Sequence, residues 1–335
     1  MSKGALVALS LACAATSMAA PDAGRVATFM REVVGLSEAQ IASVEAGEVV
    51  IRQLPAADKP EIAAFGAVRV RGDRAAVLQK VRSDLVRSRG AILESGRFSR
   101  PPRVEDLAAL TLDDDTFGAV RDCRPEHCRI KLSRAAMEKV RGDIDWKAAE
   151  ARSRTTEVLK EMLVDYMSAY IKGGTAQMAT FVDKEEPLDS AAEFRKVLGS
   201  SPYLIEYAPP LHRYAAEYPA GTLAGAEDFF YWSKDKYAPR PTISVFHVVI
   251  WNDPEHDLTV VASKRIYASH YFRAGVELLA VVATPDGGLD LLDLYRARID
   301  PPRGVLAGRI MGKVRGGIED MVRENLKALA GSQPR

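Results

Sequence analysis

The last third of the chain alternates apolar and polar residues with the period of antiparallel strands. Short turns such as Asn252-Asp253-Pro254 separate the segments, so the pattern predicts a meander. Its expected strands are Glu227 to Lys234, Thr242 to Trp251, Leu258 to Phe272, Val276 to Thr284 and Leu289 to Arg298. A helical period follows from about Val305 to Leu329. A curved sheet and one long helix bury both of their apolar faces when the sheet wraps around the helix.

The rest of the chain mixes helical and strand patterns. Strands are expected over 48–54 and 61–71, and helices over 23–34, from the N-cap Ser37 through Val44, after Asp73 up to Gly90, and over 190–198. The longest helical pattern in the chain is expected to be capped by Asp145 and to end at Gly173 and Gly174. Its apolar stripe, which includes Tyr166, is typical of core packing and is also a candidate cavity wall.

The first nineteen or so residues have the pattern of a bacterial secretory signal. Lys3 precedes an apolar run from Ala5 to Ala15, and small residues lead to an expected cleavage after Ala19. A lipoprotein signal at Cys13 is the less favoured interpretation, because Ser10 stands where a larger aliphatic residue is required. The run is too short to span a bilayer, and we expect no transmembrane segment in the mature chain. The mature protein is therefore expected to be periplasmic or secreted.

Charge excludes one class of partner. The 335 residues carry a formal net charge of +1, and Arg and Lys are interspersed with Asp and Glu. A nucleic-acid-binding protein would show a basic stripe with interleaved aromatic residues. We therefore expect no nucleic-acid partner.

Two cysteines, Cys123 and Cys128, remain after the expected cleavage. The flanking segments 117–121 and 129–132 have enough β character to form a hairpin that would bring the sulfurs together, so a structural disulfide is favoured. Ligation of a metal by the cysteines with His127 is the weaker alternative, because the four-residue gap does not match a Cys-x-x-Cys site.

The ending of the chain, with Gly304 to Gly317 leading into the terminal helix after a meander, resembles the helix-grip fold of the START-like (SRPBCC) superfamily. The stretches Tyr231 to Lys234 and Ser263 to Phe272 are also similar to a family of uncharacterised secreted bacterial proteins. The resemblance implies an α+β fold in which a curved antiparallel sheet wraps around the C-terminal helix. Residues 20–335 would form one domain, with a helical insertion at about 100–200.

The resemblance also implies a deep cavity between the sheet and the helix that holds an apolar ligand such as a lipid. Alternation places His247 and His270 on apolar faces, where each is either a satisfied core residue or a polar anchor for a ligand. Lys264 is assigned to the face of His270, where an ammonium needs a carboxylate or a ligand head group, and Glu277 is the candidate partner. The other candidate ligand-binding residues are Trp232, Tyr267, Phe272 and Tyr166.

Known catalytic and metal motifs are missing from the sequence. There is no Gly-x-Ser-x-Gly, His-Glu-x-x-His or Walker motif, and Asp253, Glu255, His256 and Asp257 are interpreted as a turn rather than a metal site. We expect no metal and no cofactor. The tyrosines of 203–218 are either core packing or the mouth of a pocket.

The preferred function is a periplasmic binding or carrier protein for a hydrophobic small molecule or lipid. Two alternatives remain open: an enzyme with a cyclase-like or hydrolytic reaction that uses His270, Lys264 and Tyr267, and an envelope module that contacts another protein.

Overall fold

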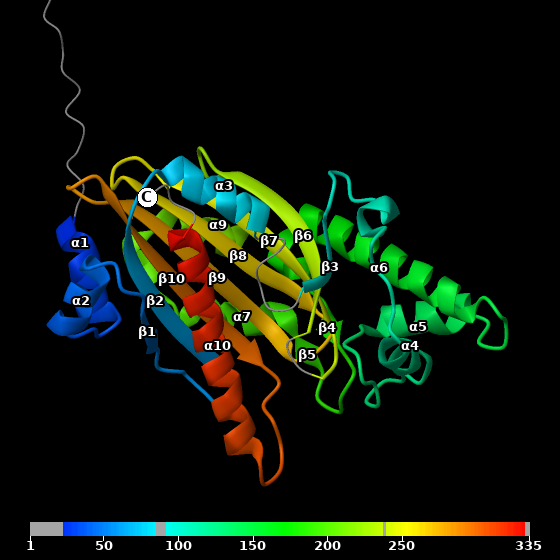
Figure 1. Cartoon of the computed structure of the whole chain (residues 1–335). Helices are drawn as coiled ribbons and strands as arrows, with labels where there is room; N and C mark the ends of the chain where they lie inside the picture. The colour runs from blue at the N-terminus through cyan, green and yellow to red at the C-terminus, as the bar shows by residue number, and fades with distance from the viewer. Residues whose placement is uncertain (1–22, 85–91, 237–238, 332–335) are drawn as a thin grey trace, which may run out of the picture.

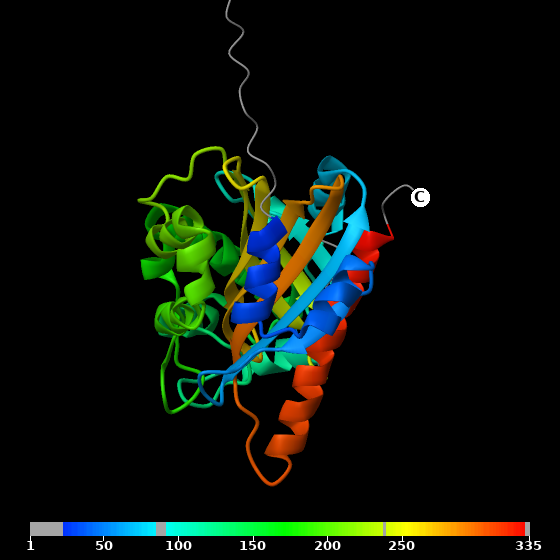
Figure 2. The ribbon, with the colours of Figure 1, turned by 90° about the vertical axis from the view of Figure 1, so that its left-hand side faces the viewer.

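The computed structural model describes residues 23–84, 92–236 and 239–331. The expected signal segment and Gly90 lie outside these residues. The fold is α+β, with a large antiparallel sheet between two layers of helices (Figure 1, Figure 2).

The sheet has eight strands in the order β1-β2-β10-β9-β8-β7-β6-β3. Their bounds are β1 Val50–Gln53, β2 Glu61–Arg71, β3 Ile92–Arg97, β6 Glu227–Asp235, β7 Thr242–Asp253, β8 Leu258–Ala268, β9 Phe272–Ala283 and β10 Gly288–Ile299. All neighbours are antiparallel, and β6 to β10 form the predicted meander. The last strand, β10, then pairs along its length with β2, which the sequence predicted at its observed bounds.

One face of the sheet carries α3 (Arg74–Asp84) and the C-terminal helix α10 (Ala307–Ala330). Only the C-terminal half of α10 is held tightly, through Val322, Leu326 and Leu329, which are buried. A Cβ atom at Gly66 of β2 would lie 2.6 Å from Val322 Cγ1, so the helix rests directly on this glycine. The N-terminal half of α10 extends beyond the ends of the strands (Figure 1, Figure 2).

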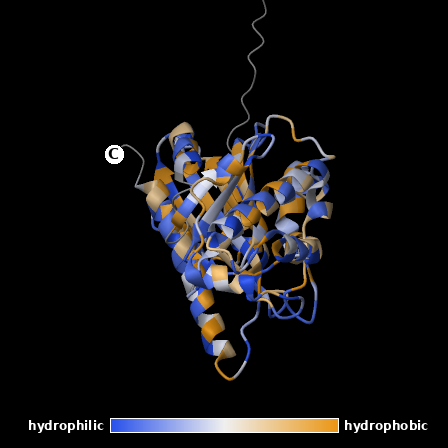
Figure 3. Cartoon of the chain, turned by 90° about the vertical axis from the view of Figure 1, so that its right-hand side faces the viewer, coloured by the Kyte–Doolittle hydropathy of each residue, from blue (hydrophilic) through white to orange (hydrophobic). Residues whose placement is uncertain are grey.

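The opposite face is covered by helices from residues 23–45 and 114–217 (Figure 2). The N-terminal ones are α1 (Ala23–Thr28), the π-helical turn η1 (Phe29–Val33) and α2 (Glu38–Glu45). The others are α4 (Asp114–Arg121), α5 (Arg134–Asp143), α6 (Ala151–Gly173), α7 (Ser190–Gly199), α8 (Pro202–Tyr207) and α9 (Pro209–Glu217), with 3-10 turns at Val104–Leu107 and Gly174–Gln177. A two-stranded ribbon, β4 (Thr180–Phe181) with β5 (Leu188–Asp189), precedes α7. Apolar and polar residues are mixed along the helices of this side (Figure 3).

Local signals explain several boundaries. Ser37 caps α2 as predicted, and its side chain accepts a hydrogen bond from Gln40 N while the Gln40 side chain accepts one from Ser37 N. The long helix α6 ends at Gly173 as predicted, because Gly174 adopts a φ of +59°. The prediction that Asp145 caps this helix was wrong, because Asp145 Oδ1 accepts from Lys147 N in a separate turn and α6 begins at Ala151.

No helix among the described residues is both long and apolar enough to cross a membrane.

Candidate functional site

A cavity of about 770 Å³ lies beside the N-terminal half of α10, at the end of the sheet where β9 begins and β10 finishes. Its sheet side is formed by Tyr271 and Phe272 at the start of β9 and by Ile299 at the end of β10. The helix side is formed mainly by Ile310, Val314, Ile318 and Met321, with Lys313, Gly317, Asp320, Glu324 and Asn325 toward the rim. The cavity therefore has apolar walls and charged groups of both signs at its edges.

One glycine of α10 contributes to this open space. Gly308, Gly312, Gly316 and Gly317 lie in its N-terminal half, and a Cβ atom added at any of them would meet nothing within 4 Å. Large side chains at these positions would occupy some of the space around the helix. Gly317 lines the cavity, whereas Gly312 does not.

A charged network fixes the wall at Asp300, which lines the cavity between β10 and α10. Its carboxylate contacts Lys131 Nζ, Lys184 Nζ at 3.1 Å and Arg273 Nε at 3.1 Å. Burial favours the neutral acid, but Lys131 and Lys184 outweigh burial and hold the pKa of Asp300 below its ordinary value. Asp300 N also donates to Tyr271 O at 2.7 Å, which ties the β10–α10 connection to the start of β9. The carboxylate at this wall is therefore fully engaged in ion pairs with cations of the protein.

Of the candidate ligand-binding residues, Phe272 lines this cavity. His247, Lys264, Trp232, Tyr166 and Tyr267 lie instead with the helices of the opposite face. The expectation that they share one cavity with α10 was wrong, because strand alternation directs their side chains to the face that α4–α9 cover.

His247 on β7 is buried in a hydrogen-bonded aromatic cluster. Its Nε2 lies 3.1 Å from Asp228 Oδ2, and its Nδ1 lies 3.2 Å from the Tyr170 hydroxyl. A neutral imidazole satisfies both contacts when Nε2–H donates to Asp228 and Nδ1 accepts from Tyr170. Burial lowers the pKa of His247 to about 4, although the bond to Asp228 opposes the shift. Both ring nitrogens are engaged, which is the arrangement of a satisfied core histidine.

Asp228 connects this cluster to the surface. Its carboxylate accepts from Arg100 Nη2 at 2.7 Å and from the Tyr214 hydroxyl at 3.3 Å, as well as from His247. Burial raises the pKa of Asp228, but the bonds from His247 and Arg100 outweigh burial and lower it to about 2. The carboxylate is therefore ionised at neutral pH and holds the histidine in place.

Lys264 on β8 is the cross-strand neighbour of His247. Its Nζ donates to Thr175 Oγ1 at 2.7 Å and lies 3.8 Å from the centre of the Phe194 ring. Among the described residues it forms no ion pair, and burial lowers its pKa well below the ordinary value. The prediction that Glu277 pairs with Lys264 was wrong. Glu277 Oε1 instead accepts a hydrogen bond at 3.4 Å from the Asn325 side chain of α10, on the other face of the sheet.

His270 was expected inside a strand, but it lies in the turn between β8 and β9. Its Nδ1 contacts Ser269 Oγ at 2.9 Å, and burial lowers its pKa to about 4. Strand β8 ends at Ala268, and Tyr271 adopts a φ of +60° where the chain turns into β9. His270 therefore does not share the face of Lys264 through strand alternation.

Smaller cavities lie under the helices of the opposite face. One of about 90 Å³ is lined by Tyr203, Tyr207 and Phe29 against β8, β9 and β10. A second of about 80 Å³ is lined by Tyr166 and Tyr267. Tyr214 and Tyr218 border a third of about 20 Å³. The tyrosines of 203–218 thus combine core packing with cavity walls.

The Asp253–Asp257 segment is the turn between β7 and β8, as the sequence predicted. Ligand atoms of Asp253, Glu255 and His256 lie within 4.8 Å of one another. His256 Nδ1 is 2.8 Å from Asp253 Oδ2, so the histidine serves to close the turn.

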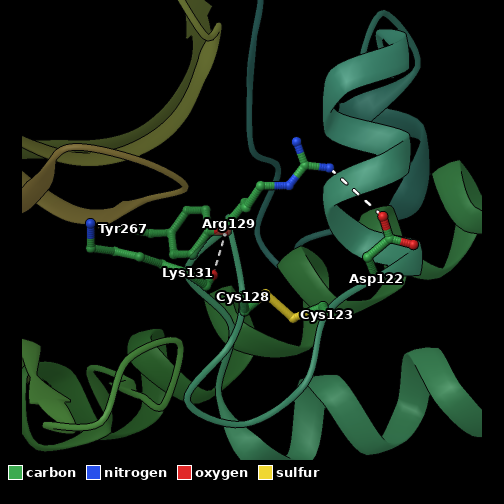
Figure 4. The surroundings of a disulfide bond; sticks show 6 residues. All are labelled: Asp122, Cys123, Cys128, Arg129, Lys131 and Tyr267. Carbon is green, nitrogen blue, oxygen red and sulfur yellow. Dashed lines mark hydrogen bonds and ion pairs between the residues drawn. A yellow bond between two sulfur atoms is a disulfide. The ribbon is translucent and has the colours of Figure 1, made fainter.

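Cys123 and Cys128 form the expected disulfide, with 4.4 Å between their Cα atoms (Figure 4). The hairpin predicted around it was wrong, because residues 114–121 form α4 and only Arg124 and His127 make a β-bridge. The Tyr267 hydroxyl donates to Lys131 O at 3.2 Å and links this loop to β8 (Figure 4). Lys131, three residues after Cys128, also binds Asp300 at the wall of the large cavity.

No family model matches the sequence, and no curated protein matches it either. Among solved structures, the chain is similar to the crystal structure of the Mll3558 protein from Rhizobium loti, at 14% sequence identity. That similarity covers 38% of this chain and 88% of that chain with a TM-score of 0.16, which is too low to support an argument about fold or function.

Proposed function

We propose that this protein binds a hydrophobic small molecule or lipid in the cavity beside α10 and acts as a carrier or binding protein outside the cytosol. The observation that carries the proposal is the cavity of about 770 Å³, whose size lies in the range of small-molecule sites. Its location between the sheet and the terminal helix agrees with the helix-grip interpretation of the sequence.

The chemistry of the walls supports an amphiphilic ligand. Phe272, Ile310, Val314 and Ile318 offer apolar contact for a hydrocarbon portion. Lys313 and other charged residues stand at the edges, where a polar head group would keep its contact with water. A ligand with an apolar body and a polar end would therefore satisfy both parts of the cavity.

The enzyme alternative depended on His270, Lys264 and Tyr267 acting on a ligand in this cavity. None of the three is among the described residues that line it. We therefore propose binding without a catalytic step.

A pair of glycine variants tests the site. Gly317→Leu places a side chain in the cavity, whereas Gly312→Leu makes the same change on the same helix outside it. Both replace glycine with a residue of higher helix propensity, so any general effect on α10 is shared. We expect Gly317→Leu to abolish binding of a fluorescent apolar probe and Gly312→Leu to retain it. Equal probe binding by both variants would refute the site.

The ligand itself is sought by native mass spectrometry of protein purified from a periplasmic fraction, followed by organic extraction. We expect a copurifying apolar molecule in the wild type and in Gly312→Leu, and its loss in Gly317→Leu. Absence of the mature protein from the periplasm would contradict the proposed location, and a ligand-free wild type that binds no apolar probe would contradict the proposed function.

A further inference from the structure

The connection between β10 and α10 and the first turns of the helix form a projecting apolar surface. Val305 is fully exposed, Leu306 is 61% exposed and Ile310 is 44% exposed. These residues lie at the end of α10 that extends beyond the strands (Figure 2, Figure 3). We call residues 303–315 the α10 tip. Large apolar side chains gathered at a projecting end are typical of an interaction surface.

The charge of the tip has one sign. Its charged residues are Arg303, Arg309, Lys313 and Arg315, and no acidic residue occurs between 301 and 318. The first turn of α10 contains no acidic residue to complement the helix dipole, and the helix has no side-chain N-cap. Cations near a helix N-terminus oppose its dipole, so this arrangement lowers the stability of the isolated helix. An anionic partner bound at the tip would offset the unfavourable interaction between these cations and the helix dipole.

The tip and the large cavity share a wall. Ile310 is both an exposed residue of the tip and a lining residue of the cavity, and Lys313 follows it on the cavity side. A partner that covers Leu306 and Ile310 would therefore lie at the opening of the cavity. An apolar ligand could pass between that partner and the cavity without crossing water over a long distance.

We propose that the α10 tip docks on an anionic phospholipid surface. Exposed aliphatic residues among basic side chains, in a segment with no acidic residue between 301 and 318, match the boundary between acyl chains and negatively charged head groups. The ligand's route to the membrane rests on the proposed function, because it requires the cavity. The docking itself depends only on the α10 tip. The two are therefore tested with different residues.

Vesicle cosedimentation of the mature protein tests the docking. Phosphatidylcholine vesicles with and without phosphatidylglycerol serve as the probes, at low and high salt. We expect binding only to the anionic vesicles, and its loss at high salt because exposed charges are screened. Arg303→Gln with Arg309→Gln is expected to weaken binding about 30-fold, since each basic residue near such a surface contributes on the order of fivefold.

A second variant, Val305→Ser with Leu306→Ser, removes apolar contact without touching the cavity lining and is expected to weaken binding at least about tenfold. Ile205→Ser with Arg134→Gln is the matched control, because both residues are exposed outside the tip. Equal binding by the tip variants and the control, or equal binding to neutral and anionic vesicles, would overturn the proposal. Self-association through the tip in sedimentation velocity, with no vesicle binding, would also overturn it.

Gly317→Leu separates the two proposals. It is expected to lose the apolar probe and keep vesicle binding, whereas the Val305/Leu306 variant should do the reverse. A wild type that binds vesicles but no apolar probe would retain the docking surface and refute the cavity function.

Discussion

Acid should destabilise this protein through His247, whose neutral form the fold requires. In the folded protein burial lowers the pKa of His247 to about 4, below the ordinary value of 6.5. The unfolded chain therefore binds more protons than the folded chain between these two values, and stability falls as pH is lowered across that window. Above about 6.5 both states carry a neutral ring, and this group has no further effect.

The expected size follows from the gap between the two pKa values. A gap of about 2.5 pH units at about 1.4 kcal/mol per unit gives about 3–4 kcal/mol of stability lost when the acid titration is complete. His270, with a pKa also lowered to about 4 by burial, adds a similar contribution over the same window. Asp228, with a pKa of about 2, is ionised in the folded state throughout this range and adds a separate loss only below its ordinary value of 3.8.

His247→Gln isolates the contribution, because an amide does not titrate yet can still hydrogen-bond to Asp228. Guanidinium unfolding of the wild type and the variant at a series of pH values measures the difference. We expect the variant to be less stable than the wild type at neutral pH, because the ring contacts with Phe230 and Tyr218 are lost. Between pH 6.5 and 4 the variant should lose about half as much stability as the wild type loses. His127→Gln, in the exposed disulfide loop, is the matched control. Parallel acid profiles for His247→Gln and the wild type would refute the reasoning.

Three other changes have defined outcomes in the same unfolding assay. Lys264→Met should stabilise the protein at neutral pH by about 1 kcal/mol, because the cost of burying this amine, which has no ion pair in the described chain, exceeds the gain from its hydrogen bond to Thr175. A loss of stability would contradict this. Gly66→Ala should destabilise by about 1–3 kcal/mol, because its Cβ would overlap Val322 and Leu326, and a neutral effect would show that α10 shifts freely on β2. Reduction of Cys123–Cys128 should cost about 2 kcal/mol and increase proteolysis of that loop; unchanged cleavage would argue against a structural role.

Periodicity in the sequence predicted seven of the eight strands of the large sheet and the terminal helix, but it did not predict the edge strand β3 (Ile92–Arg97). Strand β2 has a clear alternation between Gly72 and the loop before Glu61, and its predicted bounds match those observed. The meander was also predicted, because each strand is bounded by turn residues. Local capping signals at Ser37 fixed α2. The cap is an interaction within a few residues, and the alternation along each strand reflects which side chains are buried, so a sequence pattern records both directly.

The sequence pattern did not predict on which face of the sheet each candidate ligand-binding residue lies. Strand β7 is buried on both faces, so apolar residues follow one another without a polar face to identify the outside. His247 and Lys264 therefore could not be assigned to α4–α9 or to α10 from alternation alone. Around Cys123 and Cys128 the five-residue separation correctly indicated the disulfide, but packing against the remainder of the helical region selected a helix for 114–121 where β propensity favoured a strand.

The pairing of β2 with β10 has a consequence for how the chain folds. Arg69 and Asp290 form an ion pair across these strands although 221 residues separate them. Closing so long a loop has a large entropic cost, and contacts distant in sequence slow folding. Until residues 288–299 are available, β2 and β9 each lack a neighbour and expose an unpaired edge to other chains. A nascent chain that stops before β10 should therefore aggregate through those edges, and assembly of the central sheet is expected to be the slow step of folding.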